Sequence, residues 1–298
     1  MFPKISTLRG AQVRFLLAAS FLKMNGDTKD IAIVYLVGGI SSRFGGKIKQ
    51  FSKVGPEGET LIEYSLKQAL SAGFSKIIFI VGNKTEKPFK EMFGNNYQGI
   101  PVYYALQKQD EETRDRPWGT VEAVVAAKDF LDCSFVVCNG DDLYGENAFK
   151  VLAEHLNNSE DEATVGYKLK EVLPQEGKTN RGIFNIDENN YIRYLKEVFD
   201  IEKSKLEEQG LKEDDLCSMN IFALHLKTIE MLKQILARFK QEHEGDRRAE
   251  CLLPNEISRL IEWNKIKMKV YPATERWFGI TNPGDEEIVR KMLQKTYK

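Results

Sequence analysis

A glycine-rich, cationic loop after residue 37 is the segment of this chain best suited to chemistry. Its glycines, hydroxyls and cations are Gly38, Gly39, Gly45, Gly46, Ser41, Ser42, Arg43, Lys47 and Lys49. No acidic residue follows until Glu57. Backbone N–H groups next to glycine, together with fixed positive charge, suit a multiply charged anion, and phosphate is the obvious candidate. The loop therefore predicts phosphate chemistry.

Two familiar phosphate loops do not fit this segment. A Walker A loop ending at Gly46-Lys47 requires glycine at position 41 and serine or threonine at position 48, where Ser41 and Ile48 stand. A dinucleotide-binding loop requires glycine at position 40 and an acid at the end of the next strand, and both are missing. A glycine-rich turn without function is the remaining alternative, and the density of cations argues against it.

An acidic pair, Asp141 and Asp142, follows an apolar run and a glycine. Ligands of open α/β sheets bind outside the carboxyl ends of the strands, so this pair is placed to hold Mg²⁺ at the sheet edge. The alternative is a turn or the N-cap of a helix at 146–156. Cations for phosphates and a carboxylate for a metal together indicate a phosphoryl-transfer site.

The elements that must position these groups alternate between strand and helix. Apolar runs predict strands at 31–37, 76–81, 101–106 and 134–138, and amphipathic patterns predict helices at 60–72, 85–93 and 120–130. Such alternation predicts an α/β fold of three layers, with a mostly parallel sheet covered on both faces. The charged segment 107–117 is expected to be a mobile loop.

The second half of the chain has a different pattern. Strands separated by polar turns are predicted at 163–169, 182–187, 191–198 and 218–224, which indicates an antiparallel extension of the sheet. The charge-dense segment 200–215 is expected to be a helical insertion or a loop. Helices at 229–239, 254–263 and 285–296 and a strand at 266–271 complete the pattern. We expect one domain over 30–298.

Composition excludes several classes of protein. The net charge of −1 gives no global attraction to nucleic acid or to an anionic membrane, and no apolar stretch is long enough to predict a membrane span. Three histidines without metal-ligand spacing argue against zinc chemistry and a histidine-based triad. Four cysteines without paired spacing indicate reduced thiols, mostly buried, in a reducing compartment. The expected location is cytoplasmic, and a homo-oligomer is compatible with the sequence.

The first 29 residues are expected to form a basic and apolar N-terminal extension. Lys4, Arg9, Arg14 and Lys23 lie in the first 26 residues, which contain no acid. An amphipathic arm packed on the domain and an organellar transit sequence both explain this composition.

Beyond these patterns, the chain resembles the nucleotidyltransferase (nucleotide-sugar pyrophosphorylase) family, whose fold is GT-A-like and Rossmann-like. The family's opening motif, Leu-Ala-Gly-Gly-x-Gly-x-Arg with a downstream Lys, is matched by Leu36-Val37-Gly38-Gly39-Ile40-Ser41-Ser42-Arg43 and Lys49-Gln50. Further blocks that match are Gly58-Glu59-Thr60-Leu61, Pro117-Trp118-Gly119-Thr120, Asn139-Gly140-Asp141 and Ser218-Met219-Asn220. The resemblance covers roughly residues 31–296 and implies a nucleotide-binding half at 30–150 and a sugar- or acceptor-binding half at 151–298. It implies transfer of a nucleotidyl group from an NTP to a sugar 1-phosphate, with Mg²⁺ as cofactor.

The resemblance also implies a role for individual residues. Arg43 would clamp the triphosphate, Lys49 would neutralise the α-phosphate, and Asp141, with Asp142 beside it, would hold Mg²⁺. The nucleotide-binding groups would be Val37, Gly38, Gly39, Ser41, Ser42, Gln107, Gly119 and Thr120. The sugar- or acceptor-binding groups would be Arg181, Gly182, Glu197 and Asn220. A solvated strand end is the alternative for Glu197, and a hydrogen-bonded core amide is the alternative for Asn220.

Two departures from the family pattern keep other functions open. Ser41 replaces a loop glycine, and Gly279 stands where the family often has a second metal carboxylate, for which Asp142 or Asp285 could substitute. The first alternative function is a cytidylyltransferase acting on another phosphorylated alcohol. The second is a catalytically inactive homologue, a regulatory protein that binds nucleotide sugars. The base, the sugar and the oligomeric state are not fixed by the sequence.

Overall fold

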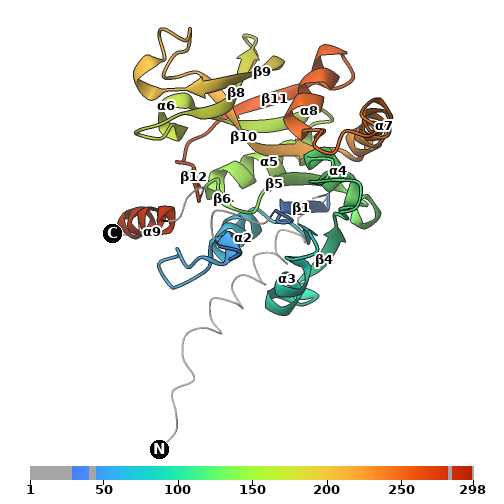
Figure 1. Cartoon of the computed structure of the whole chain (residues 1–298). Helices are drawn as coiled ribbons and strands as arrows, with labels where there is room; N and C mark the ends of the chain where they lie inside the picture. Colours follow the sequence, from blue (N-terminus) through green and yellow to red (C-terminus); the bar gives the residue numbers. More distant parts are fainter. Residues whose placement is uncertain (1–28, 40–44, 281–283, 297–298) are drawn as a thin grey trace, which may run out of the picture.

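The computed structural model describes residues 29–39, 45–280 and 284–296, and its centre is one mixed β-sheet (Figure 1). Within these residues the sheet has ten strands, in the order β11-β7-β10-β5-β1-β2-β4-β3, with β8 joined to β10 and β9 joined to β8. The strands are β1 (Ile31–Leu36), β2 (Lys76–Val81), β3 (Asn96–Tyr97), β4 (Ile100–Leu106), β5 (Ser134–Asn139), β7 (Glu162–Lys168), β8 (Thr179–Ile186), β9 (Ile192–Ile201), β10 (Leu216–Leu224) and β11 (Met268–Pro272). The predicted N-terminal extension lies outside the described residues, apart from Lys29.

The sheet changes direction between the two halves of the chain. Strands β5, β1, β2 and β4 are parallel neighbours. Strand β10 is antiparallel to both β5 and β7, and the β8–β9 hairpin extends from β10. A second, two-stranded sheet pairs β6 (Asp142–Leu143) with β12 (Phe278–Gly279). This topology confirms the predicted fold, a mostly parallel sheet with an antiparallel extension.

Helices cover both faces of the sheet. One face carries α2 (Leu61–Ser71), α3 (Glu86–Phe93), α5 (Glu146–Asn158) and α6 (Leu169–Val172), and the other carries α4 (Thr120–Ala126), α7 (Leu226–Glu242) and α8 (Leu253–Glu262). Strand β1 shows why: Ile33 and Tyr35 point into the first core, whereas Ala32 and Val34 point into the second. Side chains alternate along a strand, so a continuous apolar run packs both layers at once.

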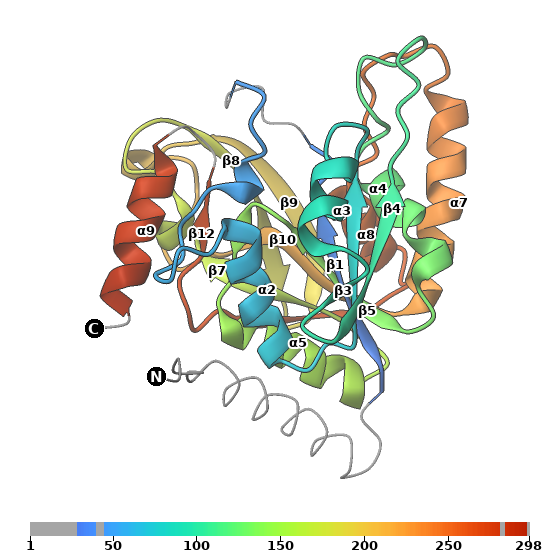
Figure 2. The same cartoon turned by 90° about the horizontal axis from the view of Figure 1, so that it is seen from below.

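The last helix, α9 (Asp285–Thr296), lies at one side of the molecule, and α7 lies at the other, with the sheet between them (Figure 2). Buried side chains of α9 form a third small core with Leu61 of α2, Leu143 of β6 and Ile280. This packing holds the segment after β12 against β6. It therefore places the C-terminal part of the chain beside the acidic pair.

Local sequence signals explain several boundaries. Helix α2 begins after a capping box, in which the Thr60 hydroxyl accepts the Glu63 N–H and the Glu63 carboxylate accepts the Thr60 N–H. The predicted helix at 120–130 is wrong in part. It ends at Ala126 and continues as a 3-10 turn, Lys128–Phe130, because the Ala127 and Phe130 N–H groups bond three residues back.

Within the described part of the chain, no helix combines the length and the apolar character needed to cross a membrane. The four cysteines are free, with Cys138, Cys217 and Cys251 buried and Cys133 half-buried. The segment 200–215 contains one 3-10 turn, Lys203–Lys205, and is otherwise a loop after the end of β9.

Candidate active site

The carboxyl ends of four parallel strands meet at one edge of the sheet. Three backbone hydrogen bonds join the residues that follow them: Val37 N to Ile80 O at 2.9 Å, Gln107 N to Val81 O at 2.8 Å, and Gly140 N to Leu36 O at 3.1 Å. The loops after β1, β4 and β5 therefore start side by side. Ligands of open α/β sheets bind at this edge.

Lys49 and Asp141, which come from two of these loops, are in direct contact. The Lys49 Nζ forms an ion pair with Asp141 Oδ2 and donates a hydrogen bond to the carbonyl of Ile280 at 3.2 Å. Only 18% of the Lys49 side chain and 24% of the Asp141 side chain are exposed, so their attraction is screened less than at an open surface. Arg43, the other predicted catalytic cation, lies outside the described residues, as do Ser41 and Ser42.

Asp142 is buried next to this pair. Its Oδ2 accepts a hydrogen bond from Asn139 Nδ2 at 2.9 Å and lies 3.2 Å from the Tyr144 hydroxyl. Burial, and to a smaller extent the neighbouring charge of Asp141, raise the pKa of Asp142 to about 7. The N-cap of α5 is Gly145, without a side-chain cap, so the alternative reading of the acidic pair as a helix cap is wrong.

Gly279 lies directly opposite Asp142 in the β6–β12 ladder. A Cβ at this position would lie 2.7 Å from Asp142 Oδ1 and 2.3 Å from Cζ2 of Trp277. A side chain therefore does not fit at 279 while Asp142 and Trp277 keep these positions. The space for which the family often supplies a second carboxylate is filled here by Asp142 and an indole ring.

The acidic pair fits a hard divalent cation. Mg²⁺ is commonly held by one or two carboxylates together with substrate phosphates, and two adjacent carboxylates are present here. Burial and mutual repulsion, which raise the pKa of Asp142, are the conditions that a cation relieves. Among the described residues, no group of three or more His, Cys, Asp and Glu side chains is arranged to hold a metal.

Gln107 and Gly119, two of the predicted nucleotide-binding residues, are joined by a direct hydrogen bond, and Glu122 lies beside them. The Gln107 Nε2 donates to Gly119 O at 3.0 Å and to Glu122 Oε2 at 3.3 Å, and the Trp118 N–H donates to the same carboxylate oxygen at 3.0 Å. Both partners of the Gln107 amide are acceptors, so its nitrogen must face them and its oxygen remains available. The Val37 N–H is already bonded to Ile80 O, which leaves only the Val37 carbonyl for a ligand.

Gly119 and Thr120 are also fixed by the segment that precedes α8. Gly119 has a φ of +94°, and a Cβ there would lie 2.5 Å from the carbonyl oxygen of Cys251, so only glycine fits. The Thr120 hydroxyl accepts the Leu253 N–H at 2.7 Å, which ties the start of α4 to the start of α8.

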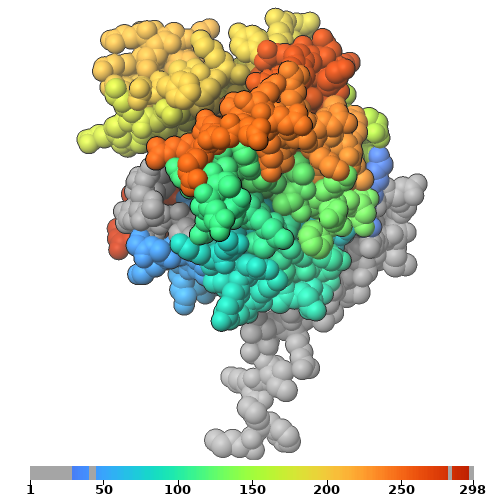
Figure 3. All heavy atoms as spheres, turned by 45° about the vertical axis from the view of Figure 1, so that its right-hand side comes forward, coloured from blue at the N-terminus to red at the C-terminus, as the bar shows by residue number. Residues whose placement is uncertain are grey.

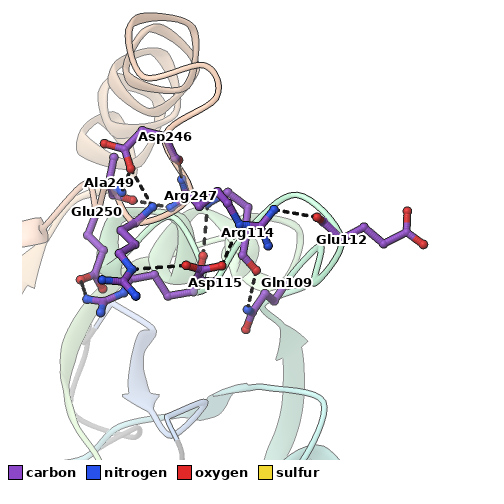
Figure 4. A network of polar contacts seen from close by, with 10 residues as sticks. Gln109, Glu112, Arg114, Asp115, Asp246, Arg247, Ala249 and Glu250 are labelled. Atoms are coloured by element: carbon purple, nitrogen blue, oxygen red, sulfur yellow. Dashed lines mark hydrogen bonds and ion pairs between the residues drawn. The ribbon is translucent and has the colours of Figure 1, made fainter.

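The loop 107–117, which we expect to be mobile, is anchored by several contacts near its C-terminal end. Arg114 is 4% exposed, its guanidinium lies 3.6 Å from the centre of the Trp118 ring, and it donates to the carbonyls of Asp246 and Ala249 (Figure 4). Asp115 adds ion pairs to Arg247 and Arg248. In Figure 3 the orange segment before α8 lies on the green loop. Charged side chains that predict a solvated loop, such as Arg114 and Asp115, therefore bind the segment that precedes α8.

The predicted acceptor residues lie on β8, β9 and β10. Arg181 lies near Asp142 and Glu197, whose charges act on it. Gly182 is opposite Glu197 in the β8–β9 ladder, and a Cβ on it would meet the Leu195 side chain, so its small size serves packing. Glu197 is exposed, as a solvated residue or a sugar-binding residue would both be, and its contact with a sugar stays a prediction.

Asn220 is exposed at an irregularity in β10, with a φ of +59°. The alternative reading of Asn220 as a core amide is therefore wrong. Its neighbour Met219 is joined to the acidic pair through Tyr144, whose hydroxyl donates to Met219 O at 2.8 Å.

Sequence reasoning missed four residues that organise this site. Tyr144 connects Asp142 with β10, Glu122 and Arg114 shape the loop beside Gln107, and Trp277 lies against Gly279. Their partners are distant in the sequence. Glu122, for example, also accepts a hydrogen bond from Lys240 at 2.6 Å, and no local pattern distinguishes it from a solvated helix residue.

Known proteins share this fold. The UTP–glucose-1-phosphate uridylyltransferase AglF of Haloferax volcanii is 24% identical over 116 residues, which are 39% of this chain and 43% of that protein. The matched segment is thus less than half the length of that relative. A UDP-glucose pyrophosphorylase complexed with UDP-glucose superposes with a TM-score of 0.64 at 13% identity, covering 90% of this chain and 99% of that chain. The inositol-1-phosphate CTP transferase from T. maritima gives a TM-score of 0.62 at 15% identity, covering 91% and 97%.

The identities to the two solved structures are low enough that these likenesses show a common fold and nothing finer. The family model described as nucleotidyl transferase matches residues 36–251. That match spans well over half of the chain and includes the glycine-rich loop, Lys49, Gln107 and the acidic pair. The chain belongs to the nucleotidyl transferase family.

Proposed function

We propose that this chain is a nucleotidylyltransferase that joins an NTP and a sugar 1-phosphate to give an NDP-sugar and pyrophosphate. The observation that carries the proposal is the contact of Lys49 with Asp141 at the edge where the parallel strands end. The names of a uridylyltransferase relative and of a UDP-glucose pyrophosphorylase with the same fold support a sugar 1-phosphate as the acceptor.

The reaction needs charge stabilisation more than proton transfer. An oxygen of the acceptor phosphate attacks the α-phosphorus, the bond from that phosphorus to the bridging oxygen of the β-phosphate breaks, and pyrophosphate leaves with the bond electrons. The second pKa of a phosphate monoester is about 6, so the attacking oxygen is ionised at neutral pH and needs no general base. The barrier lies in bringing anions together, which fixed cations reduce.

The chain's own residues divide that task. The Lys49 ammonium would neutralise charge on the α-phosphate, and Arg43 is proposed to hold the triphosphate. The free amide oxygen of Gln107 is available to accept an N–H of the base. Asp141 and Asp142 would hold Mg²⁺, which when bound neutralises phosphate charge and polarises P–O bonds.

A pyrophosphate-release assay tests this function. The wild-type protein is incubated with each NTP against a panel of sugar 1-phosphates, with Mg²⁺ and then with EDTA. The proposal predicts release with at least one NTP and sugar 1-phosphate pair, and loss of release with EDTA. Release only with CTP and a non-sugar phosphate ester would favour the cytidylyltransferase alternative. Nucleotide binding without release from any pair would contradict the enzymatic function.

The variant Asp141→Asn supplies the metal control. It keeps the shape of the side chain and removes the charge that contacts Lys49. We expect pyrophosphate release to fall by at least about 100-fold, as for removal of one charge-stabilising group. Undiminished turnover in this variant would refute the role of Asp141.

A further inference from the structure

Two buried N–H donors beside the acidic pair have no acceptor in the described part of the chain. They are the Nε of Arg181, on β8, and the Nε1 of Trp277, immediately before β12. An unsatisfied buried donor is unfavourable, and native proteins contain few of them. Two such donors in one place indicate that a group beyond the described residues completes their hydrogen bonds, and a bound ligand is such a group.

Arg181 has spare donors, and it forms no ion pair with any of the described residues. Its Nη1 donates to Thr179 Oγ1 and to Asn180 O, both at 2.9 Å, and its Nη2 donates to Val172 O at 3.0 Å. All three acceptors are uncharged. Of the five N–H donors of a guanidinium, the Nε–H and one N–H of Nη2 are left. An arginine with two neighbouring free donors suits an oxyanion, which it can hold through both.

Trp277 connects this arginine to the acidic pair. The Arg181 guanidinium carbon lies 5.8 Å from the centre of the Trp277 ring. A Cβ added to Gly279 would lie 2.3 Å from the same ring and 2.7 Å from Asp142 Oδ1, so the ring and this carboxylate lie on the same side of Gly279. Asp142 also contributes electrostatically to Arg181. The two orphan donors and the acidic pair therefore belong to one cluster.

We propose that Arg181 and Trp277 form the subsite for the phosphate of the acceptor, a phosphate monoester dianion whose oxygens accept the Arg181 Nε–H and the Trp277 Nε1–H. This inference rests on the proposed function. A dianion that approaches Asp141 and Asp142 is repelled by them, and a guanidinium without an ion-pair partner offsets that repulsion. Arg181 and Trp277 come from the second half of the chain, whereas Gln107 and Gly119, the predicted contacts of the base, come from the first, so we assign the acceptor and not the base to this cluster.

The test uses Trp277→Phe, which keeps an aromatic ring and removes the N–H, and Arg181→Lys, which keeps the charge and removes the paired donors. Each variant should raise the KM for the acceptor found in the pyrophosphate screen by about tenfold or more, as expected for loss of a hydrogen bond to a charged group. The KM for the NTP should stay within twofold. Trp263→Phe is the matched control, because Trp263 also lies beside an arginine, Arg259, at 5.9 Å, on the surface.

A second readout does not depend on turnover. Inorganic phosphate, compared with chloride at equal ionic strength, should raise the melting temperature of the wild type and of Trp263→Phe. It should raise that of Trp277→Phe and Arg181→Lys much less. Without phosphate, Trp277→Phe should melt somewhat lower than the wild type, because phenylalanine leaves part of the space beside Gly279 empty. The readout is therefore the rise that phosphate causes in each protein, which the loss of a residue that only supports the fold would leave unchanged.

Several results would overturn the inference. They are an unchanged acceptor KM in both variants, a rise in the NTP KM instead, or no phosphate-dependent stabilisation of the wild type. Failure of the proposed function looks different, because then the wild type itself releases no pyrophosphate from any pair.

Discussion

Glu162 provides a test of the structure that is independent of catalysis. It begins β7 and is fully buried, and its carboxylate accepts hydrogen bonds from the Thr228 hydroxyl at 2.5 Å and from the His225 backbone N–H at 2.8 Å. Burial raises the pKa of Glu162 from 4.5 to about 7, against the opposing effect of these hydrogen bonds. The folded protein therefore binds this proton more tightly than the unfolded chain does.

The sign and size of the effect follow from that difference. The contribution of Glu162 to stability is fully present below the unfolded pKa of 4.5 and is lost as the pH rises through about 7. A difference of one pKa unit between the folded and unfolded states corresponds to about 1.4 kcal/mol, so the free energy of unfolding that is lost through Glu162 is about 3 kcal/mol. Glu162→Gln keeps both hydrogen bonds, because its amide oxygen can accept from His225 and its NH₂ can donate to Thr228. The variant has no carboxyl group at position 162 and therefore no proton to bind there.

The assay is urea unfolding of the wild type and of Glu162→Gln between pH 4 and pH 8.5. We expect the free energy of unfolding of the wild type, relative to the variant, to fall by about 3 kcal/mol across this range. Asp142, whose pKa is also raised to about 7, titrates in both proteins and cancels in the comparison. Parallel stability curves for the two proteins would refute the placement of an ionisable carboxyl in this core.

Two further variants, Arg114→Lys and Gly119→Ala, test the loop beside Gln107, and each has a control variant. Arg114→Lys should lower the free energy of unfolding by about 2 kcal/mol and raise the KM for the NTP about tenfold, because the single nitrogen of lysine cannot reproduce the hydrogen bonds that the planar guanidinium donates from three nitrogens to the carbonyls of Arg116, Asp246 and Ala249. Arg116→Ala, which removes only an exposed ion pair, should change stability by less than about 1 kcal/mol, and equal effects of the two variants would contradict the assignment. Gly119→Ala should cost about 3 kcal/mol, because it combines backbone strain with a clash against a carbonyl oxygen. Gly73→Ala has a similar φ of +91° in open space and should cost only about 1 kcal/mol, so equal losses in urea unfolding would argue against the close approach at Gly119.

Much of the fold was predictable because the apolar pattern is strong where both faces of the sheet are covered. Strand β2 (Lys76–Val81) and helix α9 (Asp285–Thr296) have the predicted boundaries, since apolar periodicity and end signals coincide there. The weaker predictions concern elements that depend on distant partners. Strands β6 and β12 have two residues each and exist because they pair with one another.

The candidate site divides in the same way. Lys49 and Asp141 each follow a motif with a local signal, and the parallel topology brings them into contact. Arg114 and Glu122 have no such signal. Arg114 reads as part of a solvated charge run, and its buried position depends on carbonyls of Asp246 and Ala249, which lie 132 and 135 residues further along the chain. Tertiary contacts of this kind decide burial, and a single sequence does not encode them in a local pattern.

Lys49 is the group on which the proposed chemistry depends most. The decisive measurement is the rate of pyrophosphate release by the wild type, Lys49→Ala and Lys53→Ala at saturating NTP and acceptor. Lys53 is the control, because it is an exposed lysine close to Lys49 in the sequence but beyond the glycine-rich loop. We predict that Lys49→Ala lowers kcat by at least about 100-fold, while Lys53→Ala stays within a few-fold of the wild type. A Lys49→Ala enzyme that keeps kcat within a few-fold of the wild type would contradict the account.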